Sequence, residues 1–210
     1  MLQNILKNFK REYKTLNLIE VSKQNLIYNF RYLSSLSKKV KIAPVIKSNG
    51  YGHGILSVAK ILEKRNPPYF CVDSLYEAYE LQKAGIKIPI LITGYTNPEN
   101  LKVKKLPFSY AVYTLDLAKA INDYQVQAGI HIFVDTGMRR EGVTIEELPK
   151  FLEALKEYPK LKIEGVMSHL ASSNGKNDPI FSSQIKNFKK ALAIFKKYKI
   201  KPKWIHIAAS

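Results

Sequence analysis

One short segment of the chain joins a primary amine to a turn rich in glycine. Lys47 follows an apolar run, and positions 48–54 read SNGYGHG. An amine at this point can form a Schiff base with an aldehyde cofactor, and the glycines let the backbone adopt left-handed angles close to a ligand. The Tyr51 hydroxyl can donate a hydrogen bond to a phosphate. Position alone also fits a plainer interpretation, in which Lys47 simply reaches into solvent. Glycine-rich turns are common, so the turn by itself does not indicate a ligand site.

Three later segments carry further polar side chains. They are VDTGMRR at 134–140, GVMSHLA at 165–171 and HIAAS at 206–210, and their candidates are Arg140, His169, His206 and Ser210. Each also has a plainer interpretation: an arginine pair in a loop is usually solvated, a lone histidine is as often a core residue, and Ser210 alone indicates nothing.

The elements that would position these residues alternate between short apolar runs and stretches with a helical period of about 3.6 residues. The predicted strands, too apolar to alternate and so expected to be buried on both faces, are 41–46, 69–72, 88–92, 109–112, 130–134, 163–167 and 203–207. The predicted helices are 22–37, 55–64, 75–83, 115–125, 145–155 and 182–198. Ser74 and Thr144 are predicted helix N-caps, and Gly85 and Gly129 predicted helix ends.

Repeated β/α units without a G-x-G-x-x-G after the first strand favour an α/β fold of the (β/α)8 TIM-barrel type over a doubly wound sheet. An eight-stranded barrel takes about 250 residues on average, and this chain has 210. We therefore expect one barrel domain, residues 1–210, that is incomplete at its C-terminal end and lacks the eighth strand. Its active face would lie at the carboxyl ends of the strands, where Lys47 stands.

Composition excludes several other classes of protein. The net charge of +17 invites a nucleic-acid partner, but the basic residues are spread over nearly every predicted helix, which favours solvated faces and no nucleic acid. The single cysteine, Cys71, lies in an apolar run, so we expect a buried small hydrophobe, no disulfide and no metal site. Without a signal peptide or a run of about 18 apolar residues, we expect a cytoplasmic protein with no membrane partner.

Together, the segment VIKSNGYGHG at 45–54 closely resembles the pyridoxal-phosphate motif of the alanine racemase family, and the three later segments follow in that family's order. Each segment comes just after a strand that the apolar pattern predicts independently. The resemblance implies a fold type III enzyme that is dependent on pyridoxal 5′-phosphate and interconverts L- and D-alanine. It also implies a homodimer that acts on a small amino acid and supplies D-alanine for peptidoglycan.

The resemblance implies a role for each candidate. Lys47 would carry the cofactor and then act as acid or base on one face of the substrate Cα. Arg140 would bond the cofactor's phenolic oxygen and help place the substrate carboxylate, whereas Arg139 would be a surface charge. The other cofactor-binding residues would be Tyr51 and Ser210 at the phosphate, His169 against the pyridine ring, and His206 behind an arginine that faces the pyridine nitrogen.

Three positions depart from the family pattern. Phe133 stands where many members have a lysine, carbamylated in some, that supports the arginine, so Arg140 must be held in another way. Ala209 replaces a usual asparagine, and Glu141 a common aliphatic residue. The eighth strand, a glycine-rich phosphate loop and a C-terminal β-domain, which supplies a tyrosine to the partner subunit, are also absent. Because racemisation needs proton transfer on both Cα faces, we expect this segment alone to be inactive.

Other interpretations stay open on the sequence. The single-domain pyridoxal-phosphate homeostasis family has a similar barrel without the second domain, although its lysine motif lacks the Asn-x-Tyr-Gly-His-Gly continuation. Racemases of serine or lysine share that continuation, so the sequence indicates the type of reaction better than the substrate. A basic, non-catalytic nucleic-acid-binding protein is a third possibility, which salt-dependent retention on DNA would reveal.

Overall fold

The computed structural model describes residues 16–126, 128–172, 174–175 and 177–208. Within these ranges the strands form one seven-stranded sheet in the order β1-β2-β3-β4-β6-β7, with β5 paired to β4, and every pairing is parallel. The strands are β1 Phe70–Val72, β2 Ile90–Ile92, β3 Ser109–Val112, β4 Gly129–Asp135, β5 Val143–Thr144, β6 Lys162–His169 and β7 Trp204–Ala208.

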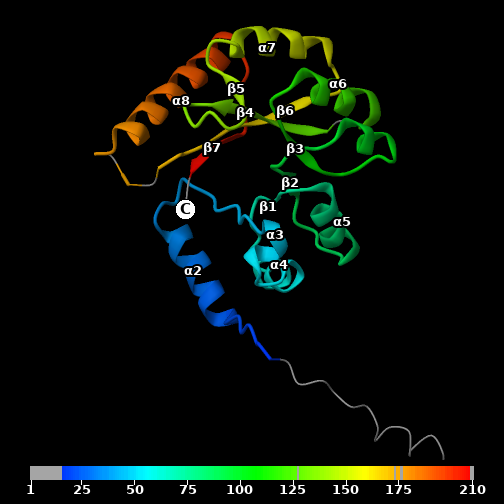
Figure 1. The fold of residues 1–210 in the computed structure, drawn as a ribbon, viewed down its shortest axis with the longest axis vertical. Coiled ribbons are helices and arrows are strands. Elements are labelled where there is room, and N and C mark those ends of the chain that lie inside the picture. The colour runs from blue at the N-terminus through cyan, green and yellow to red at the C-terminus, as the bar shows by residue number, and fades with distance from the viewer. Residues whose placement is uncertain (1–15, 127, 173, 176, 209–210) are drawn as a thin grey trace, which may run out of the picture.

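Helices surround this sheet in an arc (Figure 1). They are α2 Lys23–Ser35, α3 Lys47–Tyr51, α4 Ile55–Glu63, α5 Leu75–Lys83, α6 Leu115–Tyr124, α7 Leu148–Ala154 and α8 Pro179–Lys197, with the 3-10 turns η2 Pro98–Lys102 and η3 Leu155–Glu157. Successive main strands from β1 to β7 are joined through a helix or 3-10 turn on the outside of the sheet, and the short β5 lies in the connection between β4 and α7. The result is a curled half-barrel, which confirms the predicted α/β barrel class.

The two faces of the sheet contribute to separate apolar clusters. In β3, Tyr110 and Val112 belong to the large core between sheet and helices, whereas Ala111 belongs to a small cluster with Phe133 and Met167 on the inner face. Successive side chains of a strand point to opposite faces, so both faces of β3 and of its short neighbours β1 and β2 are apolar. This explains why the strands read as continuous apolar runs rather than alternating ones, and Cys71 is buried in the inner face as predicted.

The predicted strand at 41–46 is wrong. Only Val45 forms a bridge, parallel to Cys71, with the Ile46 N–H donating to the Cys71 carbonyl and the Cys71 N–H to the Pro44 carbonyl, each at 2.9 Å. Pro44 has no N–H to extend the ladder, and its apolar neighbours therefore continue as irregular extended chain. The other six predicted strands are present.

The predicted helix ends are confirmed at two positions and wrong at two. The Ser74 side chain accepts from the Glu77 N–H at the start of α5, and Gly85, with φ of +80°, follows its end. Thr144 ends β5, and its hydroxyl accepts from the Glu147 N–H at 3.3 Å in the turn before α7, but the helix itself begins only after Glu147. Gly129 begins β4, where an added Cβ would lie 2.2 Å from a Glu164 carboxylate oxygen, so the glycine makes room for a cross-strand side chain rather than ending a helix.

Within the described ranges, none of the helices combines the length and apolar content that crossing a bilayer requires.

Candidate active site

Lys47 opens a short turn of left-handed helix, directly after the extended segment that begins the first β/α unit and before helix α4. Ser48, Asn49, Gly50 and Tyr51 all have φ between +53° and +64°. Left-handed helical angles cost a residue with a side chain about 1–2 kcal/mol, so the three non-glycine residues of this turn, Ser48, Asn49 and Tyr51, must be held by their surroundings. Residues in such conformations cluster at functional sites, where the surrounding structure maintains them.

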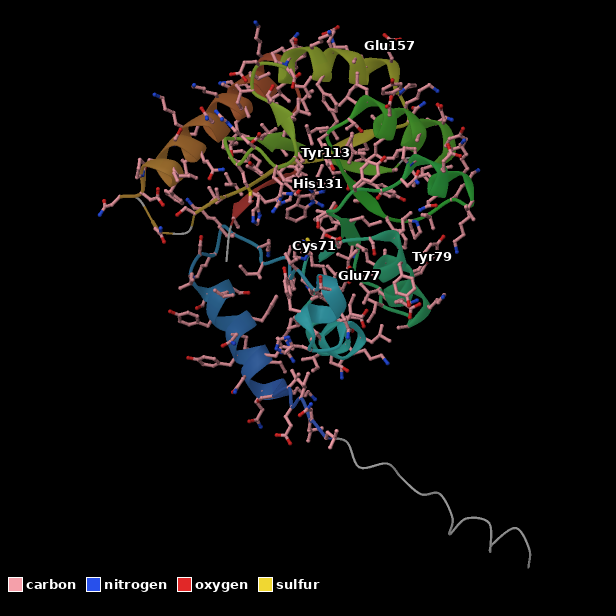
Figure 2. The ribbon with its side chains drawn as sticks, viewed as in Figure 1. Cys71, Glu77, Tyr79, Tyr113, His131 and Glu157 are labelled. Atoms are coloured by element: carbon pink, nitrogen blue, oxygen red, sulfur yellow. The ribbon has the colours of Figure 1, made fainter. Side chains whose placement is uncertain are left out.

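The side chains of Asn49 and Glu77 hold this turn. The Asn49 side-chain oxygen accepts from the Ile55 N–H at 2.9 Å. One oxygen of Glu77, in the first turn of α5, accepts from the Asn49 N–H at 3.2 Å, and its other oxygen accepts from the Asp73 N–H at 2.9 Å. Glu77 (Figure 2) therefore ties the Lys47 turn to the residue that follows β1.

That residue, Asp73, also pairs with the amine. Lys47 Nζ lies 3.2 Å from Asp73 Oδ1, and both side chains are partly exposed, at 37% and 54%. The amine is thus accessible to a ligand from solvent, and the carboxylate fixes its position. Ion pairs of this exposure add little to the stability of the fold, so the contact with Asp73 serves mainly to orient the Lys47 amine.

Arg140 lies in the loop that follows β4. Asp135 anchors that loop, because its Oδ1 accepts from the N–H groups of Gly137 at 2.8 Å and Arg139 at 3.1 Å. Nε and a terminal nitrogen of Arg140 donate to the same Glu141 oxygen, at 3.2 and 2.9 Å. The loop therefore presents a guanidinium that is already paired with a carboxylate.

His169 ends β6, and a recess brings it together with Arg140. The recess is lined by Phe133, Val134, Asp135, Met138, Arg140, Glu141, Ser168 and His169. Burial lowers the pKa of His169, the positive charges of Arg140 and Lys47 lower it further, and the Glu141 carboxylate opposes them. Lys47 follows the parallel bridge at Val45, Arg140 lies in the loop after β4 and His169 ends β6, so all three lie at the carboxyl ends of parallel strands, at one edge of the sheet.

The other predicted site residues lie elsewhere or outside the described residues. Tyr51 ends the left-handed turn with a side chain that is 59% exposed. His206 lies on β7 opposite Met167 and belongs to an interior pair instead of the recess. Ser210 and Ala209 fall outside the described residues.

The interior pair joins β4 to β7. His131 Nδ1 and His206 Nε2 are 2.8 Å apart, so one ring donates and the other accepts. Burial lowers the pKa of His206 to about 4 and that of His131 to about 3, with the neighbouring ring adding to the second shift. Both rings are therefore neutral at pH 7. The His131 ring (Figure 2) also meets the Tyr69 ring edge to face at 5.3 Å.

Sequence reasoning missed Asp73, Glu77 and His131 as parts of these arrangements. Asp73 had a signal, because it directly follows a correctly predicted strand, as catalytic residues of barrels often do. Nothing in the sequence pairs His131 with His206, since the two are 75 positions apart. Among the described residues, no group of three or more histidine, cysteine or acidic side chains is arranged to hold a metal ion.

Most of this chain is similar in sequence to known proteins. The family profile described as "Alanine racemase, N-terminal domain" matches residues 21–210. An alanine racemase of Carboxydothermus hydrogenoformans is 37% identical over 198 residues, which are 91% of this chain and 53% of that protein. Alanine racemase 1 of Caldanaerobacter subterraneus is 34% identical over 197 residues, covering 90% of this chain and 51% of that protein.

Solved structures show the same similarity. The alanine racemase of Bacillus anthracis with bound L-Ala-P superposes with a TM-score of 0.85 at 28% identity, covering 94% of this chain and 53% of that one. The enzyme of Clostridium difficile gives a TM-score of 0.81 at 30% identity, covering 88% and 50%. The chain thus spans about half the length of the relatives it matches.

Proposed function

The chain belongs to the alanine racemase family, and from that premise we propose that it forms the cofactor-binding barrel of an enzyme that interconverts L- and D-alanine with pyridoxal 5′-phosphate. The observation that carries the proposal is the gathering of Lys47, Arg140 and His169 at the carboxyl ends of the strands. We also propose that residues 1–210 belong to one barrel domain, that the protein acts in the cytoplasm as a homodimer, and that its D-alanine serves peptidoglycan synthesis.

The chemistry of these side chains fits the cofactor. Pyridoxal 5′-phosphate offers an aldehyde, an anionic phenolic oxygen, a flat ring and a phosphate. Lys47 supplies an accessible amine for the aldehyde, Arg140 a guanidinium for the anionic oxygen, and His169 a partly buried ring. We propose Tyr51 and Ser210 at the phosphate and His206 beyond the pyridine nitrogen. When bound, the cofactor supplies an electron sink that weakens the Cα–H bond of an attached amino acid.

The chain's own residues then act around that bond. Once its amine is free, Lys47 Nζ accepts or returns the Cα proton on one face. Asp73 orients the amine through their 3.2 Å contact. The His169 ring stays neutral because its pKa is lowered, so it packs beside the ligand without adding a third positive charge to those of Lys47 and Arg140.

Racemisation also requires a second acid or base. A proton removed and returned on one face restores the original configuration, so a group on the opposite face must complete the reaction. The relatives are about twice as long as the matched segment. We therefore propose that the second group is carried by residues beyond this segment, on the partner subunit of the homodimer.

The test uses the protein encoded by the whole reading frame, purified with the cofactor in excess. We expect D-alanine to form from L-alanine, as measured by chiral chromatography. Lys47→Ala should abolish the reaction and the visible absorbance of bound cofactor, while the matched exposed variant Lys83→Ala on α5 should retain both. Borohydride reduction followed by peptide mass spectrometry should place the cofactor on Lys47.

Two results would overturn the proposal, and a third would change only its substrate. A cofactor label on another lysine would remove the role of Lys47. A folded, cofactor-loaded protein that racemises no amino acid would favour the homeostasis family, and racemisation of serine or lysine with no action on alanine would change the substrate but keep the reaction type.

A further inference from the structure

The acidic partner of Arg140 is the next residue of the same loop, Glu141. Two guanidinium nitrogens donate to one Glu141 oxygen, at 3.2 and 2.9 Å. The Arg140 side chain is 53% exposed, whereas that of Glu141 is only 23% exposed. The carboxylate is therefore the more fixed of the two partners, and the guanidinium is the one that reaches outward.

Tyr113, the residue that directly follows β3, is close enough to Glu141 for the two groups to interact electrostatically. Burial raises the pKa of Tyr113, and the negative charge of the Glu141 carboxylate raises it further. The neutral phenol is thus the stable form, and it can donate to the carboxylate at any pH at which an enzyme works.

The Tyr113 ring has its own support. It meets the Phe133 ring edge to face, with 6.1 Å between centroids and an angle of 88°. Phe133 is buried on the inner face of β4 together with Ala111 and Met167. An edge-to-face contact of this kind restricts the tilt of both rings, so ring packing fixes the position of the Tyr113 hydroxyl.

These contacts form one continuous series across neighbouring strands. Tyr113 follows β3, Phe133 lies on β4, and Arg140 and Glu141 lie in the loop after β4. Phe133, Arg140 and Glu141 also line the recess that contains His169. The series therefore ends at the place where the charges of the candidate site gather.

We propose that Glu141 and Tyr113 are positioning residues that hold the Arg140 guanidinium for its ligand. This inference rests on the proposed function, because Arg140 is the ligand-binding group only if that function is correct. The carboxylate that fixes the arginine is a side chain of the loop itself, so neither a modified residue nor an added anion is needed at the buried Phe133.

The physical reason is that a free arginine side chain has several rotatable bonds and no preferred direction. A carboxylate that accepts from two guanidinium nitrogens selects one orientation, and charge-assisted hydrogen bonds are about twice as strong as neutral ones. Removing the charge of Glu141 leaves the Arg140 guanidinium intact but no longer fixes its orientation. The loss should therefore appear in ligand binding and in kcat/KM more than in folding.

The experiment uses the protein encoded by the whole reading frame and four variants. Glu141→Gln removes the charge, Glu141→Ala removes the side chain, and Tyr113→Phe removes only the hydroxyl. Glu146→Gln is the matched control, because Glu146 is an exposed carboxylate in the same connection between β4 and α7.

We expect kcat/KM for alanine to fall about ten- to hundredfold in both Glu141 variants, and less in Tyr113→Phe, while the control stays within about twofold of wild type. Acetate should restore part of the activity of Glu141→Ala and leave the wild type unchanged, since a small carboxylate can enter the vacated position. A residue that is merely structural would not show this rescue.

A second measurement does not depend on activity or on the cofactor. In the apo protein, nitrogen-15 NMR should show an Arg140 Nε–H that exchanges slowly with water in the wild type and in Glu146→Gln, and at least several-fold faster in Glu141→Gln. Wild-type kcat/KM in both Glu141 variants, or unchanged exchange of the Arg140 Nε–H, would overturn the inference. A wild-type protein with no racemase activity and the expected exchange difference would instead overturn the proposed function alone.

Discussion

Lowering the pH should destabilise the barrel through the buried pair His131 and His206. Both rings have a pKa below the ordinary value of about 6.5 because burial disfavours the charged imidazolium. Below about pH 6.5 these two histidines therefore bind protons in the unfolded chain but stay neutral in the folded chain. Stability from these groups is fully present above about pH 6.5 and is lost as the pH falls toward the folded values.

The size of the loss follows from the shifted values. A ring with a pKa of about 6.5 unfolded and of about 4 or 3 folded gives up about 2 kcal/mol between pH 7 and pH 5, so the pair gives up about 4 kcal/mol. Since domains are stabilised by only about 5–15 kcal/mol, this is a large part of the total.

Urea unfolding of the apo protein at pH 7 and pH 5, followed by circular dichroism, measures the change directly. His131→Asn removes one titrating ring, so its loss between the two pH values should be about 2 kcal/mol smaller than that of the wild type. His53→Asn is the control, because His53 is exposed and its Nδ1 contacts the Gly50 carbonyl oxygen of its own turn, at 2.8 Å, away from the interior pair, whose contribution to the loss should remain. If His131→Asn loses as much stability as the wild type, the histidine pair is not the source and the reasoning is wrong.

Three further results are expected. Arg140→Ala should lower kcat/KM about ten- to hundredfold, and Arg139→Ala much less, because a charge-assisted hydrogen bond to the ligand is worth about 1.5–3 kcal/mol; equal effects in steady-state kinetics would show that the motif is misaligned. Gly165→Ala should destabilise the fold by about 1–3 kcal/mol in urea unfolding, since its Cβ would lie 2.3 Å from His131 Nδ1; unchanged stability would mean that the strands shift freely. The 210-residue chain expressed alone should self-associate in light scattering and form no D-alanine, because the outer edge of β7 is unpaired among the described residues and such edges recruit other chains; a monodisperse monomer that racemises alanine would refute both expectations.

Local sequence determined most of the architecture. Alternating short apolar runs and helical periods predicted the β/α order, six of the strands and the approximate bounds of six helices. The motif around Lys47 indicated the family, and the family profile confirms it. These features are readable because strand burial, helical period and turn chemistry depend on residues close together in the chain.

Only the tertiary structure decided which side chains meet. The segment 41–46 has the apolar character of a strand, but Pro44 and the available partner allow a single bridge at Val45. The left-handed turn after Lys47 is maintained by Glu77, a residue of α5 in the next β/α unit. His131 on β4 contacts His206 on β7 because β4, β6 and β7 are neighbours in a fixed register. Strand order, register and curvature come from the packing of the whole sheet, so no local pattern could have predicted these contacts.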